Sequence, residues 1–174
     1  MRLFFALWPP PATARALEAW AQEVRRDTGG RVIPAASIHL TLAFLGDADP
    51  ARASAAARTV SGPRHDLPLE EARYVKRNQI VWASPRVMPD PLARLAADLH
   101  AALAAAGLAL EPRPFAAHVT LLRKARAPRA LPDLPSLSWP VDAFTLVAST
   151  LSSDGSRYEQ LQSFALASPQ RGSS

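Results

Sequence analysis

Two short segments of this 174-residue chain repeat the pattern His-x-Thr-x, and this repetition constrains the fold more than any other feature. The first segment is residues 39–42 and the second is residues 118–121, so the two histidines lie 79 residues apart (39 to 118). An arginine precedes each histidine by the same 24 residues, Arg15 in the first half and Arg94 in the second. Two copies are too few for a solenoid of stacked repeats. The spacing therefore predicts an internal duplication with two lobes related by pseudo-twofold symmetry.

The first half of the chain predicts a strand, a helix and a second strand, in that order. Residues 2–8 (Arg-Leu-Phe-Phe-Ala-Leu-Trp) are apolar enough for a buried strand, and three prolines follow them. From residue 11 to about residue 26, apolar residues recur at three- to four-residue spacing, which indicates an amphipathic helix. Gly29 and Gly30 are expected to end it, and residues 38–45 are expected to form the strand of the first motif.

The second half predicts the same order of elements. Residues 79–83 are expected to form a strand, prolines follow, and residues 91–106 carry a leucine face at helical spacing. Gly107 is the expected stop of this helix, and residues 115–123 are expected to form the strand of the second motif. The duplication thus extends from the two motifs to the elements around them.

The rest of the chain is expected to add elements to these two units. They are a helix over residues 50–60, a strand over 69–75, a proline-rich surface loop over 125–140, and strands over 141–149 and 158–167 that a turn at 152–155 joins into a hairpin. We expect residues 1–167 to form a single bilobal domain and residues 168–174 to be a disordered tail.

Composition excludes several classes of function. The chain has no cysteine, which rules out thiol catalysis, a disulfide scaffold and cysteine-ligated zinc. Its length is sufficient to bury a core without such cross-links. No apolar run approaches the roughly 18 residues that span a bilayer, and the apolar N-terminal stretch is too short for a signal peptide. These features predict a soluble, cytoplasmic protein without a membrane partner.

The basic charge suggests an anionic partner but does not establish one. The formal net charge is +5, and Lys76 and Lys124 are the only lysines among 20 basic residues, so arginine dominates. A guanidinium group suits phosphate because its planar fork can bond two oxygens at once. A chain rich in alanine, arginine and proline is equally expected from a GC-rich genome. Charge alone therefore leaves the partner open.

The two motifs place a histidine and a threonine on the same face of each strand. Side chains alternate between faces, so His39 lies beside Thr41 and His118 lies beside Thr120. If the pseudo-twofold turns these faces toward each other, one imidazole can accept a proton while the other donates one. Phosphodiester hydrolysis needs such a pair, and threonine hydroxyls can hydrogen-bond the non-bridging oxygens. This chemistry requires no metal and no other cofactor.

A single His-x-Thr is a weak signal, but the pair is specific. Chance supplies one motif often, and an isolated histidine among apolar residues is more often structural than catalytic. Two motifs in matching strand contexts favour a shared site. With them, the N-terminal run at residues 2–7 and the runs His-Leu-Thr-Leu-Ala-Phe-Leu-Gly at 39–46 and His-Val-Thr-Leu-Leu-Arg at 118–123 resemble the 2H phosphoesterase superfamily. The sequence is most similar to its RNA 2′,3′-cyclic phosphodiesterases, also called 2′-5′ RNA ligases, from Arg2 through residues 155–158.

The resemblance implies an α+β fold of two pseudo-symmetric lobes, each with an antiparallel sheet and outer helices, around a central cleft. It implies metal-independent hydrolysis of RNA 2′,3′-cyclic phosphate ends to 2′-phosphomonoesters, with 2′-5′ ligation of RNA ends in some members. By this resemblance His39 is the proton donor to the leaving 3′ oxygen, His118 is the acceptor that activates water, and Thr41 and Thr120 hold the phosphate. RNA or a nucleotide is the expected partner, and a monomer is the expected state.

Other side chains are weaker candidates. Arg123 lies five residues after His118, so strict alternation turns it away from the site, although a twist or end of the strand there would let it bind phosphate. Tyr158 and Phe5 are candidates for stacking on a base, with ordinary packing as the alternative. His65 and His100 are expected to be solvated.

Two other functions stay open at this point. One is a 2H phosphoesterase that acts on a small cyclic nucleotide. The other is a non-catalytic RNA- or nucleotide-binding module that kept the cleft, although intact histidines and threonines in both motifs argue against it.

Overall fold

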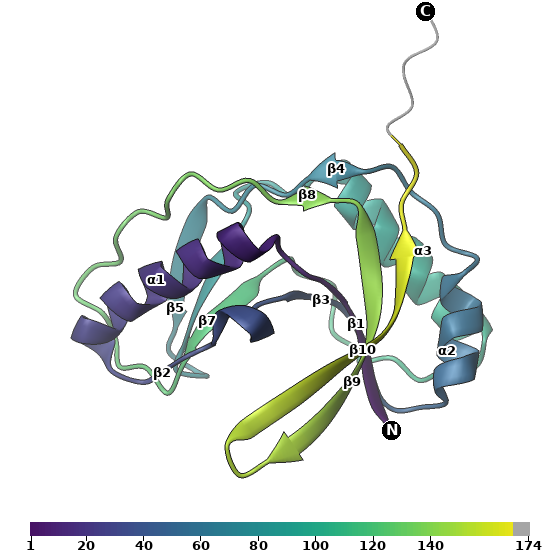
Figure 1. Ribbon diagram of the computed structural model, residues 1–174, viewed down its shortest axis with the longest axis horizontal. Helices are drawn as coiled ribbons and strands as arrows, with labels where there is room; N and C mark the ends of the chain where they lie inside the picture. Colours follow the sequence, from purple (N-terminus) through teal and green to yellow (C-terminus); the bar gives the residue numbers. More distant parts are fainter. Residues whose placement is uncertain (169–174) are drawn as a thin grey trace, which may run out of the picture.

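Two four-stranded antiparallel sheets form the body of the protein in the computed structural model, which describes residues 1–168 (Figure 1). The first sheet has the strand order β10-β9-β1-β3, and the second has the order β2-β7-β6-β5. The strands of the first are β1 (Arg2–Leu7), β3 (Leu40–Asp47), β9 (Ala143–Ser152) and β10 (Gly155–Ala165). Those of the second are β2 (Arg31–Val32), β5 (Glu71–Val75), β6 (Ile80–Ser84) and β7 (Val119–Arg123).

Helices and one small ribbon complete the described fold. The helices are α1 (Pro11–Thr28), α2 (Pro50–Ala57), α3 (Asp90–Ala105) and the short 3₁₀ turn η1 (Ala35–Ser37). Proline lies in the first turn of each of the three α-helices, where its missing N–H has no helical partner in any case. The strands β4 (His65–Asp66) and β8 (Pro140–Val141) pair with each other. The α+β class predicted from the sequence is confirmed.

The two halves of the chain build matching units. In the first, β1 is followed by α1 and, after the short β2 and η1, by β3, which pairs antiparallel with β1. In the second, β6, α3 and β7 follow one another and β6 pairs antiparallel with β7. Each unit thus carries one His-x-Thr motif at the start of its last strand, with His39 directly before β3 and His118 directly before β7.

Each long helix packs on the sheet of the other unit. The helix α1 leaves β1 of the first sheet but contacts β2 and β7 of the second. The helix α3 leaves β6 of the second sheet but contacts β3 of the first. Figure 1 shows α1 on the side of β2, β5 and β7, with α2 and α3 on the side of β9 and β10. One continuous core of buried residues includes Leu7 and Leu40 from one unit and Val81 and Leu121 from the other. Burial of these residues therefore depends on both units.

Residues 125–140 are mostly exposed, and the segment is anchored near its two ends. No helix or strand forms before Pro140, as expected, yet Trp139 is fully buried. The segment is held by α1, because the Trp20 indole N–H donates to the Asp133 carbonyl at 3.1 Å and the Thr13 hydroxyl donates to the Ser138 carbonyl. The prediction of a surface loop is therefore confirmed for most of the segment, of which only Ala125 and Trp139 are buried.

Several element boundaries differ from those expected. The helix expected over 50–60 ends at Ala57, and the strand expected over 115–123 begins only at Val119. The two-residue strands β2, β4 and β8 carry no periodic signal, since tertiary pairing alone forms them. Of the expected tail, residues 169–174 lie outside the described part of the chain. No helix within residues 1–168 is both long and apolar enough to cross a membrane.

Candidate active site

A cavity of about 260 Å³ lies between the two units and is lined by side chains from both. Its polar lining includes His39, Thr41, His118, Thr120 and Arg123. The structure therefore brings together all five residues singled out from the motifs and their surroundings. No aspartate or glutamate of residues 1–168 lines this cavity, whereas arginines do. The cleft accordingly suits an anion.

Both motif histidines are oriented by the same backbone contact. The Nδ1 atom of His39 lies 2.7 Å from the Ser37 carbonyl, and that of His118 lies 2.9 Å from the Ala116 carbonyl. A carbonyl oxygen can only accept, so Nδ1 carries the proton in both rings. Each Nε2 is then the ring nitrogen left for proton transfer, and each ring can accept a proton there when neutral or donate one when charged.

A β-bulge follows the threonine of each motif. The strand pairing of β1 with β3 skips Leu42, and that of β6 with β7 skips Leu121, which lies 79 residues later. An extra residue in a strand resets the alternation of side chains. Phe44 and Arg123, each five residues after a motif histidine, consequently line the cavity. The expectation that alternation turns Arg123 away from the site is wrong for this reason.

His100 contacts the bulge at Leu42. Its Nε2 lies 2.8 Å from the Leu42 carbonyl, so the ring of this α3 residue donates a hydrogen bond to the bulged position. His100 is partly buried, and the expectation that it is solvated is wrong. His65 is also partly buried and contacts the Pro63 carbonyl through Nδ1 at 3.0 Å, which again differs from a solvated side chain.

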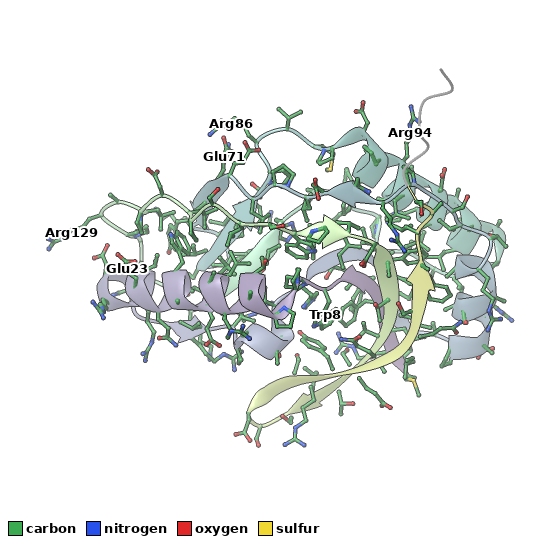
Figure 2. The ribbon with its side chains drawn as sticks, turned by 45° about the horizontal axis from the view of Figure 1, so that its top comes forward. Trp8, Glu23, Glu71, Arg86, Arg94 and Arg129 are labelled. Atoms are coloured by element: carbon green, nitrogen blue, oxygen red, sulfur yellow. The ribbon has the colours of Figure 1, made fainter. Side chains whose placement is uncertain are left out.

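Three aromatic side chains surround His39. Trp8 stacks on the imidazole with ring centroids 4.9 Å apart and planes 12° apart. The rings of Phe4 and Tyr158 lie 5.1 Å from the same imidazole. Burial here lowers the pKa of His39 below its usual 6.5, the charge of Arg123 adds to this, and the Ser37 carbonyl opposes it. Figure 2 shows Trp8 between the first turn of α1 and the β9–β10 hairpin.

His118 has a different aromatic neighbour. Trp82 of β6 lies over its ring with centroids 4.5 Å apart and planes 37° apart. The indole Nε1 of Trp82 is buried and has no hydrogen-bond partner among the described residues. The two imidazoles therefore make the same kind of backbone contact, but His39 has three aromatic neighbours and His118 has one.

The aromatic candidates divide between cleft and core. Tyr158 lines the cavity. Phe5 is fully buried and packs against Phe144 and Phe164, so ordinary packing is confirmed for it and base stacking is excluded. Phe4, its neighbour in β1, lines the cavity instead. Sequence reasoning missed Phe4 and Trp8, although strand alternation places both on the face opposite Phe5.

Residues 1–168 contain no group of three or more histidine or acidic side chains able to hold a metal ion. Acidic side chains near the second sheet pair with arginines on the surface instead. Glu71 of β5 pairs with Arg86 at 3.5 Å and with Arg73 at 3.6 Å. The site as described consists of imidazole, hydroxyl, guanidinium and aromatic groups.

Comparison with known protein families gives a match over most of the chain. The family model described as LigT like Phosphoesterase matches residues 7–82 and 84–158, and each segment contains one motif. The RNA 2′,3′-cyclic phosphodiesterase of Escherichia coli K12 is 34% identical over 170 residues, which cover 95% of this chain and 96% of that protein. The protein of the same name from Thermus thermophilus is 33% identical over 183 residues, covering 95% and 90%.

A solved structure is similar over the whole described fold. The crystal structure of Escherichia coli LigT complexed with 3′-AMP matches with a TM-score of 0.85 and 33% sequence identity. The match covers 95% of this chain and 97% of that chain, so it includes both units and the cleft between them.

Proposed function

Because this chain belongs to the LigT-like phosphoesterase family, we propose that it is a phosphodiesterase that hydrolyses 2′,3′-cyclic phosphates at RNA ends to 2′-phosphomonoesters. The observation that carries the proposal is the pairing of His39 and His118 across one cavity, each with its Nε2 left for proton transfer. A general acid and a general base on opposite sides of a phosphorus atom are what this hydrolysis requires. The RNA 2′,3′-cyclic phosphodiesterases from two bacteria support the substrate.

The reaction divides between the two histidines. Nε2 of His118 accepts a proton from water as the water oxygen bonds to phosphorus. Nε2 of His39 donates its proton to the 3′ oxygen as the bond between phosphorus and that oxygen breaks. Thr41 and Thr120 donate hydrogen bonds to the non-bridging oxygens, and the Arg123 guanidinium adds positive charge beside them. The product keeps its phosphate on the 2′ oxygen.

Substrate charge helps His39 to act as the donor. Burial lowers the pKa of His39 in the free protein, which favours the neutral ring. The negative charge of a bound cyclic phosphate favours the imidazolium form and acts in the opposite direction. Binding of the substrate should therefore be accompanied by proton uptake at His39.

The decisive experiment uses an oligoribonucleotide that ends in a 2′,3′-cyclic phosphate, incubated with the protein and EDTA. The expected product carries a 2′-phosphate, identified by its resistance to enzymes specific for 3′-phosphates. Formation of a 3′-phosphate, or loss of activity on chelation, would contradict the proposed chemistry. Adding a second RNA with a free 5′-hydroxyl tests 2′-5′ ligation, in which that hydroxyl replaces water as the nucleophile.

Two alternatives are tested by the same reagents. If the protein prefers a free mononucleoside 2′,3′-cyclic phosphate strongly over the oligoribonucleotide, a small cyclic nucleotide is its substrate. If it binds the oligoribonucleotide near neutral pH without any turnover, it is a binding module.

We also propose that the working form is a monomer in which residues 1–167 act as one domain. The buried core is continuous across both units, and the cavity is lined by side chains from both. Sedimentation at micromolar concentration tests the monomer. A cytoplasmic location agrees with the absence of cysteine and is tested by cell fractionation.

A further inference from the structure

The cleft continues past the histidines into a second cavity of about 300 Å³. This cavity lies between β2 and the tip of the β9–β10 hairpin, and Arg31 and Asp154 belong to its lining. Arg123, Ser156 and Tyr158 line both cavities, so the two adjoin at these side chains. A ligand held at the histidines therefore has room to extend toward Arg31.

Two arginines face each other in this second cavity. Arg31 of β2 and Arg123 of β7 are direct partners in the antiparallel pair, and both line the cavity. Like charges directly opposite on neighbouring strands are unfavourable. Within residues 1–168, neither guanidinium lies within ion-pair distance of a carboxylate, although Asp154 lines the same cavity. A bound anion between the guanidiniums would offset their repulsion.

The hairpin tip lies close to the Arg31 guanidinium. Gly155 has φ +116°, and a Cβ atom there would lie 3.0 Å from Nη1 of Arg31. Glycine thus allows the tip to approach the guanidinium closely and to adopt a backbone conformation that other residues rarely do. The Arg31 side chain is exposed, and it lies beside the hairpin tip at the rim of the second cavity.

We propose that Arg31, together with Arg123, binds the phosphodiester that joins the terminal nucleotide of an RNA to the rest of its chain. The inference rests on the proposed function, because it leaves the cyclic phosphate with the two histidines and Arg123. Arg123, which lines both cavities, then also contacts the next phosphate, and Arg31 binds only that one. Paired guanidiniums suit this group, since each can bond two phosphate oxygens. The second cavity therefore selects RNA ends over free mononucleotides, which lack this phosphodiester.

The experiment compares three substrates with the same terminal nucleoside 2′,3′-cyclic phosphate. The first has a free 5′-hydroxyl, the second has a 5′-phosphate, and the third is an oligoribonucleotide. The variant is Arg31→Ala, with Arg31→Gln as a second variant that keeps more of the side chain. The control is Arg94→Ala, which removes an equal charge from an exposed α3 residue that Figure 2 shows far from the hairpin tip.

For Arg31→Ala, the ratio of kcat/KM for the oligoribonucleotide to that for the 5′-hydroxyl mononucleotide should fall by about 10- to 100-fold, the usual effect of losing a charge-assisted hydrogen bond. The salt dependence of oligoribonucleotide binding should weaken by about one counterion. Arg94→Ala should keep the wild-type ratio. If the wild-type protein gives the same ratio when the 5′-phosphate mononucleotide replaces the oligoribonucleotide, the phosphate alone is recognised. An unchanged ratio in both Arg31 variants would overturn the inference.

A binding measurement separates this inference from the proposed function. An oligoribonucleotide and a mononucleotide that both end in a 2′-phosphate need no turnover to bind. If the wild-type protein hydrolyses none of the three substrates, the proposed function fails. If Arg31→Ala then weakens binding of the oligoribonucleotide but not of the mononucleotide, the second phosphate site is still supported. If the wild-type protein and Arg31→Ala bind the oligoribonucleotide with equal affinity, the site is rejected.

Discussion

Trp8 and His39 are held together by one three-residue turn. The Trp8 ring stacks on the imidazole, and its indole N–H donates to the Ala36 carbonyl at 3.3 Å. The imidazole in turn contacts the carbonyl of Ser37, the last residue of the same turn η1, at 2.7 Å. The position and the cover of His39 therefore depend on η1 and on the end of β1.

Trp8→Leu should raise the pKa of His39 toward its usual 6.5, because water then reaches a ring whose pKa burial now lowers. NMR titration of the imidazole protons measures this directly.

Folding of the wild-type chain lowers the pKa of His39. The unfolded chain therefore binds more protons just below pH 6.5, and the free energy of unfolding rises with pH there. That rise should be smaller in the variant. Trp82→Leu, which exposes His118 instead, is the control and should leave the pKa of His39 unchanged.

Replacing either motif histidine with alanine should lower kcat by about two to four orders of magnitude, the usual contribution of a general acid or base. His65→Ala is the matched control, because His65 has the same Nδ1 contact to a carbonyl two residues earlier but does not line the cavity. Its kcat should stay within about twofold of wild type. Full activity in His39→Ala or His118→Ala would remove that residue from the mechanism.

Phe5 and Phe4 should respond differently to alanine although they are neighbours. Phe5→Ala should lower the free energy of unfolding by about 3–5 kcal/mol, because its ring is fully buried in the main core. Phe4 is also buried, but in a small cluster with Ala6 and Val147, and its ring lies 5.1 Å from the His39 ring, so Phe4→Ala should reduce kcat as well as stability. Urea unfolding and steady-state kinetics measure the two effects. A larger stability loss for Phe4 would contradict this division.

Glu18 should act as a positioning residue for His39. Its carboxylate on α1 accepts a hydrogen bond from the Ala35 N–H at 2.6 Å and so fixes the start of η1. Glu18→Ala should reduce kcat by about tenfold with little change in KM, less than the hundredfold that a misplacement of about 1 Å can cost. Glu18→Gln keeps an acceptor oxygen and should restore most of kcat. A loss of melting temperature with unchanged kcat would mean that the contact is only structural.

The order of elements followed from the sequence because its signals are local. The strand, proline, helix and glycine signals of each half describe β1, α1 and β3 and then β6, α3 and β7. The spacing of the motifs indicated two related units, and their residue types indicated acid and base chemistry. Each inference needed only periodicity, residue type and distance along the chain.

Tertiary structure decided which side chains reach the cleft, because local sequence signals do not contain this information. The bulges at Leu42 and Leu121 turn Arg123 into the cleft, and a bulge forms from strand pairing that alternation alone does not report. Contacts with α1 anchor the otherwise exposed segment 125–140 through the Asp133 and Ser138 carbonyls. The sequence by itself determined which groups carry the chemistry. Their meeting in one cavity, the cover of His39 and the facing of Arg31 and Arg123 depend on contacts between residues far apart in the chain.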